Sequence, residues 1–159
     1  MSTVLVQMLK ASCARNYGML EKAIDACPDS AWSQKCGKLA FWQQAAHAFA
    51  AIDFFVRGKD DAPLHPGFSP ETLDMKNAAA QPLTRGEMKA LISTMTAHAA
   101  HYFDSLKDED LTKKHEGFSS RRGNDMPVLA VLNILIGHAM YHLAICDSVL
   151  RDNNLPGIL

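Results

Sequence analysis

The sequence predicts an all-α protein, a four-helix bundle that forms a single domain over residues 1–159. Four long segments carry apolar residues at the spacing of three and four that is typical of helices with one buried face. No segment alternates apolar and polar residues between turn signals, as a half-exposed strand would. The length suits one domain, and an apolar content of 48% can supply one continuous core.

The first helix is expected over residues 3–27, because Pro28 and Asp29 follow it and stop it. The residues expected on its inner face are Leu5, Met8, Leu9, Ser12, Met19, Ala23 and Ile24. The second helix is expected over residues 39–57, with Gly58 at the position of a C-terminal cap. Several alanines make this helix narrow, so a neighbouring helix can approach its backbone closely.

The connection over residues 58–83 carries four prolines, at positions 63, 66, 70 and 82. A structureless loop of this length is uncommon inside a compact domain. We therefore expect a crossover along the bundle, a lid over a site, or both.

The third helix has a clear start signal, since Thr84 and Glu87 form a T-x-x-E capping box. It is expected to end near Leu106, with an inner stripe of Met88, Leu91, Ile92, Met95, Ala99 and Tyr102. The charged connection over residues 107–124 leaves room for one short helical turn. Asp125 is expected to cap the fourth helix, which then continues to about Asp152.

The charge balance argues against a nucleic-acid partner, because 16 Lys and Arg stand against 17 Asp and Glu with no basic stripe. The N-terminal segment lacks the pattern of a signal peptide. The four cysteines form no CxxC pair, which favours reduced thiols and a cytoplasmic location.

Residues 126–146 contain no Asp, Glu, Lys or Arg and are long enough to span a membrane. They also contain Asn133, His138 and His142, and polar groups in hydrocarbon are costly. We therefore expect a buried central helix and no membrane partner. The apolar surplus of this segment also exceeds what one core-facing stripe can use, which predicts a homodimer.

Three histidines form the candidate metal site: His47, His138 and His142. His138 and His142 are four residues apart on the fourth helix, so their imidazoles lie on one face and can reach one ion, as in HExxH zinc helices. The glutamate of that motif is absent, because Ala139 follows His138. His47 lies on a face of the second helix that should turn inward. Three protein ligands match an open, catalytic type of site.

The other histidines are weaker candidates. His98 lies near the core stripe of the third helix, whereas His101 should point outward. His65 and His115 are expected to be solvated loop residues. Cys146 lies one turn beyond His142 and is more simply explained as a small buried side chain than as a fourth ligand. Asp53 lies on the same helix as His47 and is a candidate general base, but a surface position is the simpler expectation.

These residues resemble the DinB/YfiT-like superfamily of metalloenzymes. The second helix of that family, with its single ligand histidine, is similar to FWQQAAHAFAAIDFF, and the opening of its third helix is similar to TRGEMKALIS. Its H-x-x-x-H helix is similar to LIGHAMYHLAICDSVLRDNNLPG. Many members carry Gly-Gln two residues after the last histidine, where this chain has Ala144 and Ile145.

The resemblance implies helices that run up-down-down-up, with the crossover between the second and the third. It also implies a divalent ion, nickel or zinc, on His47, His138 and His142, and frequent dimers. Members with assigned activities include transferases that use low-molecular-weight thiols and a maleylpyruvate isomerase.

Two classes of function follow. The first is a metal-dependent enzyme, a thiol-dependent transferase or a related hydrolase or isomerase, acting on a small-molecule substrate. In such an enzyme the ion would lower the pKa of a coordinated water or thiol. The second is a non-catalytic helical module that binds metal or dimerises. A pocket of a few hundred Å³ beside the ion would favour the enzyme.

Overall fold

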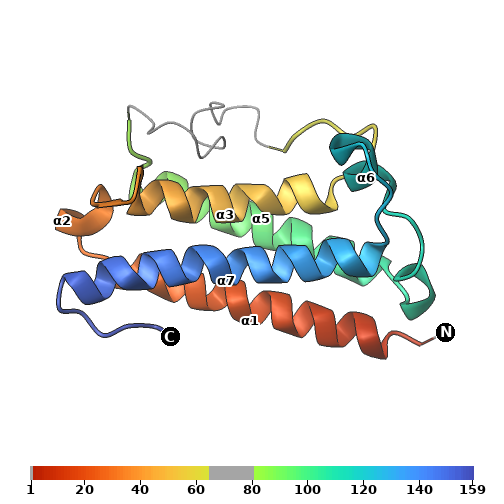
Figure 1. Ribbon diagram of the computed structural model, residues 1–159, viewed down its shortest axis with the longest axis horizontal. Helices are drawn as coiled ribbons and strands as arrows, with labels where there is room; N and C mark the ends of the chain where they lie inside the picture. The colour runs from red at the N-terminus through yellow and green to blue at the C-terminus, as the bar shows by residue number, and fades with distance from the viewer. Residues whose placement is uncertain (1, 65–80) are drawn as a thin grey trace.

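The computed structural model describes residues 2–64 and 81–159 and confirms the all-α fold class (Figure 1). Its four long helices begin and end within two residues of the predicted bounds. They are α1 (Val4–Ala26), α3 (Phe41–Val56), α5 (Arg85–Ser105) and α7 (Val128–Asp152). The short elements are α2 (Asp29–Trp32), the hairpin of β1 (Lys35–Cys36) and β2 (Leu39–Ala40), the 3-10 turn η1 (Asp108–Asp110) and α6 (Glu116–Arg122).

The long helices form two parallel pairs. Figure 1 shows α1 and α7 running one way along the long axis and α3 and α5 running the other way. The connection from α3 to α5 therefore joins opposite ends of the bundle. Residues 65–80 of this connection lie outside the described residues, and so does most of the segment expected to be a crossover or a lid.

The helix α7 is the central helix, because its inner face packs against both α1 and α3. Its length and composition would also allow a membrane span. Along its buried face, the side chains that are at most 1% exposed are Val131, Leu132, Leu135, Ala139, Leu143, Cys146, Val149 and Leu150. Only 39% of its most apolar stretch is buried, so α7 buries one face and leaves apolar residues such as Leu129 and Tyr141 exposed on the other.

The predicted inner face of α1 is wrong in its first half. Leu5 and Met8 are 55% and 63% exposed. The face that is buried instead comprises Val6, Cys13, Asn16, Tyr17, Leu20, Ala23 and Ile24. Apolar residues occur on both sides of this part of α1, so their spacing alone does not identify the side that meets α7.

One of the three predicted helix caps is confirmed. The Glu87 N–H donates to Thr84 Oγ1 at 3.2 Å, and the Thr84 N–H donates to Glu87 Oε2 at 2.8 Å, which is the expected capping box. The predicted cap at Asp125 is wrong. Pro127 takes the N-cap position of α7, and Asp125 pairs with Lys114 at 2.7 Å. Gly58 adopts no left-handed conformation, and its N–H donates to Asp61 at 3.1 Å.

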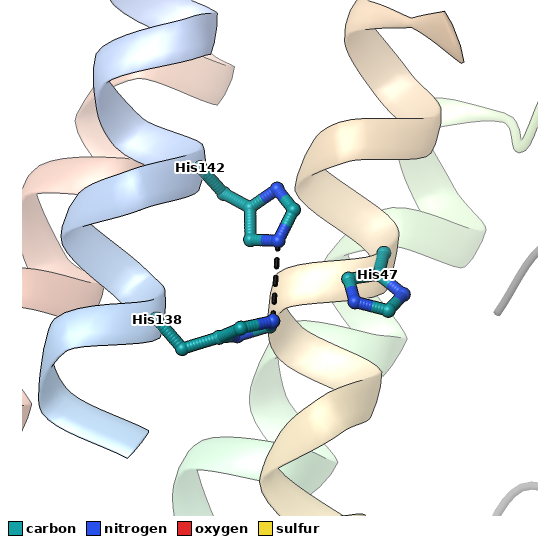
Figure 2. Close-up of side chains that lie close together, drawn as sticks. All are labelled: His47, His138 and His142. Carbon is teal, nitrogen blue, oxygen red and sulfur yellow. Dashed lines mark hydrogen bonds between the residues drawn. The ribbon is translucent and has the colours of Figure 1, made fainter. Parts of the chain in front are cut away.

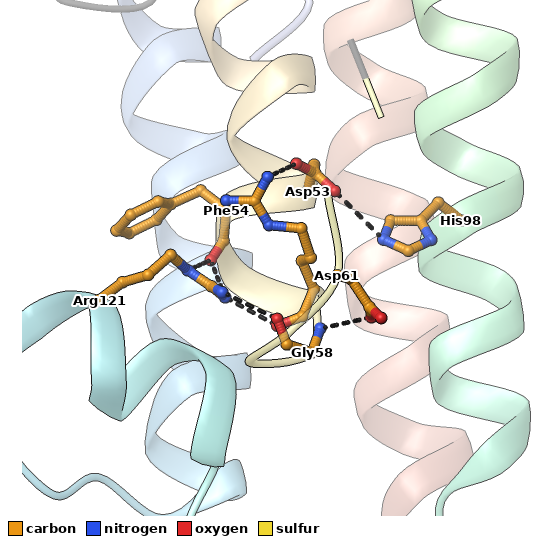
Figure 3. Close-up of polar contacts among 7 residues, drawn as sticks. Asp53, Phe54, Gly58, Asp61, His98 and Arg121 are labelled. Carbon is orange, nitrogen blue, oxygen red and sulfur yellow. Dashed lines mark hydrogen bonds and ion pairs between the residues drawn. The ribbon is translucent and has the colours of Figure 1, made fainter. Parts of the chain in front are cut away.

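The end of α3 is covered by α6 instead. Arg121 of α6 donates four hydrogen bonds of 2.8–3.2 Å to the carbonyl oxygens of Phe54, Arg57 and Gly58 (Figure 3). These carbonyls have no partner within the helix, so the guanidinium replaces a C-terminal cap. A Cβ atom on Gly117 would lie 2.1 Å from the Arg57 oxygen. Glycine at position 117 is therefore what allows α6 to pack directly on α3.

His115 is not the solvated loop residue that the sequence predicted. Its side chain is 5% exposed and caps α6, since Nδ1 accepts a hydrogen bond from the Phe118 N–H at 3.1 Å. Burial lowers the pKa of this imidazole. The connection over residues 107–124 thus holds η1 and α6, which is more structure than the single turn expected from its charge pattern.

Candidate metal centre

The three predicted histidines come together between α3 and α7. Their candidate ligand nitrogens all lie within 4.8 Å of one another. The ring centroids are 5.2 Å apart for His47 and His138, 5.0 Å for His47 and His142, and 4.5 Å for His138 and His142. Figure 2 shows the three imidazoles converging from the two helices. This arrangement supports the prediction that they can share one ion.

Local helix geometry explains the pair on α7. Side chains four residues apart stack on one side of a helix, and here the two Nε2 atoms lie 3.2 Å apart. Two nitrogens bound to one ion at about 2.1 Å lie about 3.0–3.4 Å apart for bond angles between a right angle and the tetrahedral angle. The pair is therefore spaced for one ion without any backbone movement.

Burial keeps these imidazoles neutral. The pKa of His138 is lowered to about 4, first by loss of solvent and then by the neighbouring His47. The pKa of His142 is lowered to about 3, first by burial and then by His138 and His47. Only a neutral imidazole offers a lone pair to a metal, so both groups are ready for a cation at neutral pH.

Gln44 is a site residue that the sequence did not reveal. It lies one turn before His47 on α3, is 4% exposed, and places Oε1 2.9 Å from Nδ1 of His142. Because an amide oxygen only accepts, Nδ1 of His142 carries the proton and Nε2 keeps its lone pair. Histidines that bind metals commonly donate their second ring N–H in this way. The sequence could have indicated this role, because Gln44 is a polar residue one turn from the candidate ligand His47 on the same helix.

The donor set also fits a metal because protein atoms alone do not satisfy it. With Nδ1 of His142 protonated, a hydrogen bond between the two Nε2 atoms must come from His138. The other nitrogen of that ring, Nδ1, is buried without a hydrogen-bond partner. A cation bound to both Nε2 atoms would take the place of this hydrogen bond, and the proton of His138 would then lie on Nδ1.

A cavity of about 630 Å³ opens beside the histidines. Its walls include His47 and His138, and His142 lies behind them. Apolar side chains form much of the remaining wall, namely Phe54, Phe55, Phe118, Met126 and Ile134. This volume lies within the usual range of small-molecule sites, about 300–1,000 Å³. A position next to the ligand nitrogens is thus accessible to a small molecule.

The rival candidates lie elsewhere. His98 faces Asp53, with Nε2 3.6 Å from Oδ1 (Figure 3), and His101 is exposed, as expected. Cys146 is fully buried, and desolvation raises the pKa of its thiol, which disfavours the thiolate that a metal needs. His65 lies outside the described residues. None of the described three joins the group of His47, His138 and His142.

Asp53 is a buried residue, so the expected surface position is wrong. It is 7% exposed and pairs with Arg57 through Oδ2 and Nη1 at 3.2 Å. The sequence did not reveal the burial of Asp53. Its position along the helix says nothing of the side chains that α5 and the end of α3 place beside it.

Comparison with known proteins gives one match. The family model described as the DinB superfamily matches residues 13–146, a range that holds Gln44 and all three histidines. No curated protein and no solved structure matches the chain.

Proposed function

This chain belongs to the DinB superfamily, and we propose that it is a metal-dependent enzyme whose divalent ion is held by His47, His138 and His142. The observation that carries the proposal is a group of three converging imidazoles, two of which, His47 and His138, line a cavity of about 630 Å³. Three protein ligands leave coordination positions for water or substrate.

The ion, when bound, would lower the pKa of a water or thiol beside it and so provide a nucleophile near neutral pH. The residues of the chain orient the histidines and exclude water from them. Gln44 fixes the tautomer of His142. Phe55 packs against His138 with ring centroids 5.6 Å apart, and so covers one side of this ligand with an apolar ring.

For the reaction, we propose thiol-dependent group transfer, with metal-assisted hydrolysis or isomerisation as related reactions of the same site. The family resemblance supports a low-molecular-weight thiol as co-substrate. Nickel and zinc both suit a site of three imidazoles, since imidazole is a good ligand for either ion.

A second candidate function is a metal-binding module without turnover. A structural site usually closes the shell with a fourth protein ligand. Among the described residues, the group that could hold an ion contains three histidines and no fourth ligand. The adjoining cavity and this open shell favour the enzyme.

The test is elemental analysis of purified protein loaded with nickel or zinc, alongside His142→Ala and the control His101→Ala. We expect about one ion per chain in the wild type and in the control, and far less in His142→Ala. A wild-type content below about a tenth of an ion per chain would contradict the proposal.

The variant with all three histidines replaced by alanine separates a catalytic type of site from a structural one. We expect it to bind no metal and to keep its helical circular dichroism, because the core of the bundle does not depend on these side chains. Unfolding of this variant at room temperature would indicate a structural ion and would remove the main support for an enzyme.

A further inference from the structure

We propose that the cavity beside His47 and His138 binds a carboxylate group through Arg57 and Arg122, so that its ligand is a small organic acid with an apolar body. This inference deepens the proposed function, on which the ligand's role as a substrate or co-substrate rests. The binding site itself is built from residues that hold no metal.

Both arginines lie on the cavity wall. Nε and Nη1 of Arg57 are buried and make no hydrogen bond to the described residues, although Nη1 forms an ion pair with Asp53 at 3.2 Å. Arg122 is exposed, and the described part of the chain offers it no ion pair. A carboxylate can accept two N–H groups of one guanidinium at once, which suits it to a wall that carries two arginines.

The charge on the cavity wall favours an anion. Arg57 and Arg122 carry two positive charges, and Asp53 is the acidic residue that lines the same cavity. The carboxylate of Asp53 already lies 3.2 Å from Nη1 of Arg57 and 3.6 Å from Nε2 of His98. Arg121, next in the chain to Arg122, does not compete for the ligand, because the carbonyl oxygens at the end of α3 occupy its guanidinium. A net positive wall remains for a monoanion.

The remaining wall defines the body of the ligand. An apolar and largely aromatic surface lines the same cavity as the arginines and the histidines, namely Phe54, Phe55, Phe118, Met126 and Ile134. Pairing with Asp53 holds the Arg57 guanidinium near the level of residue 53. Residues 47 and 53 are about 9 Å apart along the helix axis, at 1.5 Å per residue. An aryl-alkyl carboxylate of two or three methylene groups has this length.

The probe is 3-phenylpropionate, with its uncharged amide as the matched compound, titrated calorimetrically into metal-free protein. The variants are Arg122→Gln, Arg57→Gln and the control Arg15→Gln, an exposed arginine of α1 outside this cavity. Arg122→Gln removes an exposed and unpaired side chain, so it leaves folding unchanged. Circular dichroism checks the fold of Arg57→Gln.

We expect the acid to bind the wild type about tenfold more tightly than the amide, since charge-assisted hydrogen bonds are about twice as strong as neutral ones. Arg57→Gln should remove this preference, Arg122→Gln should reduce it about threefold, and Arg15→Gln should leave it unchanged. Equal binding of acid and amide to the wild type, or an unchanged preference in folded Arg57→Gln and Arg122→Gln, would overturn the proposal.

Metal loading separates this proposal from the proposed function. Because the arginines bind the carboxylate, the preference for the acid should persist in metal-free protein and in the triple histidine variant. A preference that appears only after loading with nickel or zinc would show that the ion binds the acid, and would overturn the arginine site while supporting the metal centre. A protein that takes up no ion but prefers the acid would contradict the metal centre and support the arginine site.

A second probe identifies the source of the carboxylate. N-acetylcysteine carries a carboxylate and a thiol, whereas 3-phenylpropionate carries no thiol. If the thiol compound displaces 3-phenylpropionate in wild type but not in Arg57→Gln, the carboxylate belongs to a low-molecular-weight thiol. If it does not displace, the carboxylate belongs to an apolar substrate. Equal displacement from the wild type and from Arg57→Gln would overturn the arginine site.

Discussion

The side-chain oxygen of Gln44 lies 2.9 Å from Nδ1 of His142, and so a residue of α3 orients a ligand of α7. The same helix supplies His47 one turn later. The candidate metal centre is therefore held by reciprocal contacts between two packed helices, and not by three independent side chains. Any shift of α3 against α7 would change both the ligand set and the tautomer of His142.

Replacing Gln44 by leucine should weaken metal binding about 10- to 100-fold, because His142 then loses the hydrogen bond that orients its ring. The control is Gln44→Glu, whose carboxylate still accepts the Nδ1–H proton and should keep the affinity near that of the wild type. Competition with a chromogenic chelator measures both affinities. Equal affinities of the leucine and glutamate variants would show that the hydrogen bond does not matter.

The metal-free protein should lose stability as the pH falls from about 6.5 toward 4. In the folded state the pKa is about 4 for His138 and about 3 for His142, below the ordinary value. The unfolded chain therefore binds more protons in this window, and acid favours unfolding. Above the ordinary pKa the two imidazoles are neutral in both states and have no effect.

The double variant His138→Ala, His142→Ala isolates this effect, because every other titrating group is common to both proteins. We expect it to gain stability relative to metal-free wild type, on the order of 2–4 kcal/mol at pH 5. Denaturant unfolding of both proteins between pH 7 and pH 4.5 measures the difference. A difference that does not change with pH would show that the site is more hydrated than the structure indicates.

Arg121→Met should lower the free energy of unfolding by roughly 1–3 kcal/mol, since it leaves the carbonyl oxygens at the end of α3 without their donor. Its neighbour provides the control. Arg122→Gln removes an exposed charge that pairs with none of the described residues, and it should change stability by less than about 0.5 kcal/mol. Thermal melts of the two variants should therefore diverge. Identical melting temperatures would mean that water replaces Arg121 without cost.

We expect a homodimer that uses α1 and α7. Exposed apolar side chains lie on both helices, including Leu5 and Met8 of α1 and Leu129 and Tyr141 of α7. Clusters of exposed apolar side chains commonly mark interfaces. The double variant Leu5→Glu, Met8→Glu should be monomeric by light scattering at micromolar concentration, whereas Lys22→Glu should stay dimeric. A monomeric wild type would contradict this prediction.

The helices themselves were largely predictable from the sequence. Turn and cap signals such as Pro28 and the Thr84–Glu87 box act within a few residues, so they fix helix ends without reference to the rest of the chain. The predictions that failed depend on a neighbour in space. Asp125 pairs with Lys114 across a turn, and Leu5 and Met8 face solvent because α7 packs on the other side of α1.

The sequence by itself determined that His138 and His142 share one face of a helix, because their spacing of four residues is a local property. It also indicated His47 as the third candidate ligand, because the face of the second helix that carries it should turn inward, and the family resemblance implied the same set. Only the tertiary structure decided that Gln44 orients His142, that Asp53 is buried against Arg57 and His98, and that a cavity with two arginines adjoins the ligands. These features depend on how α3, α5, α6 and α7 pack, and contacts between segments far apart in the chain leave no periodic signal in either segment.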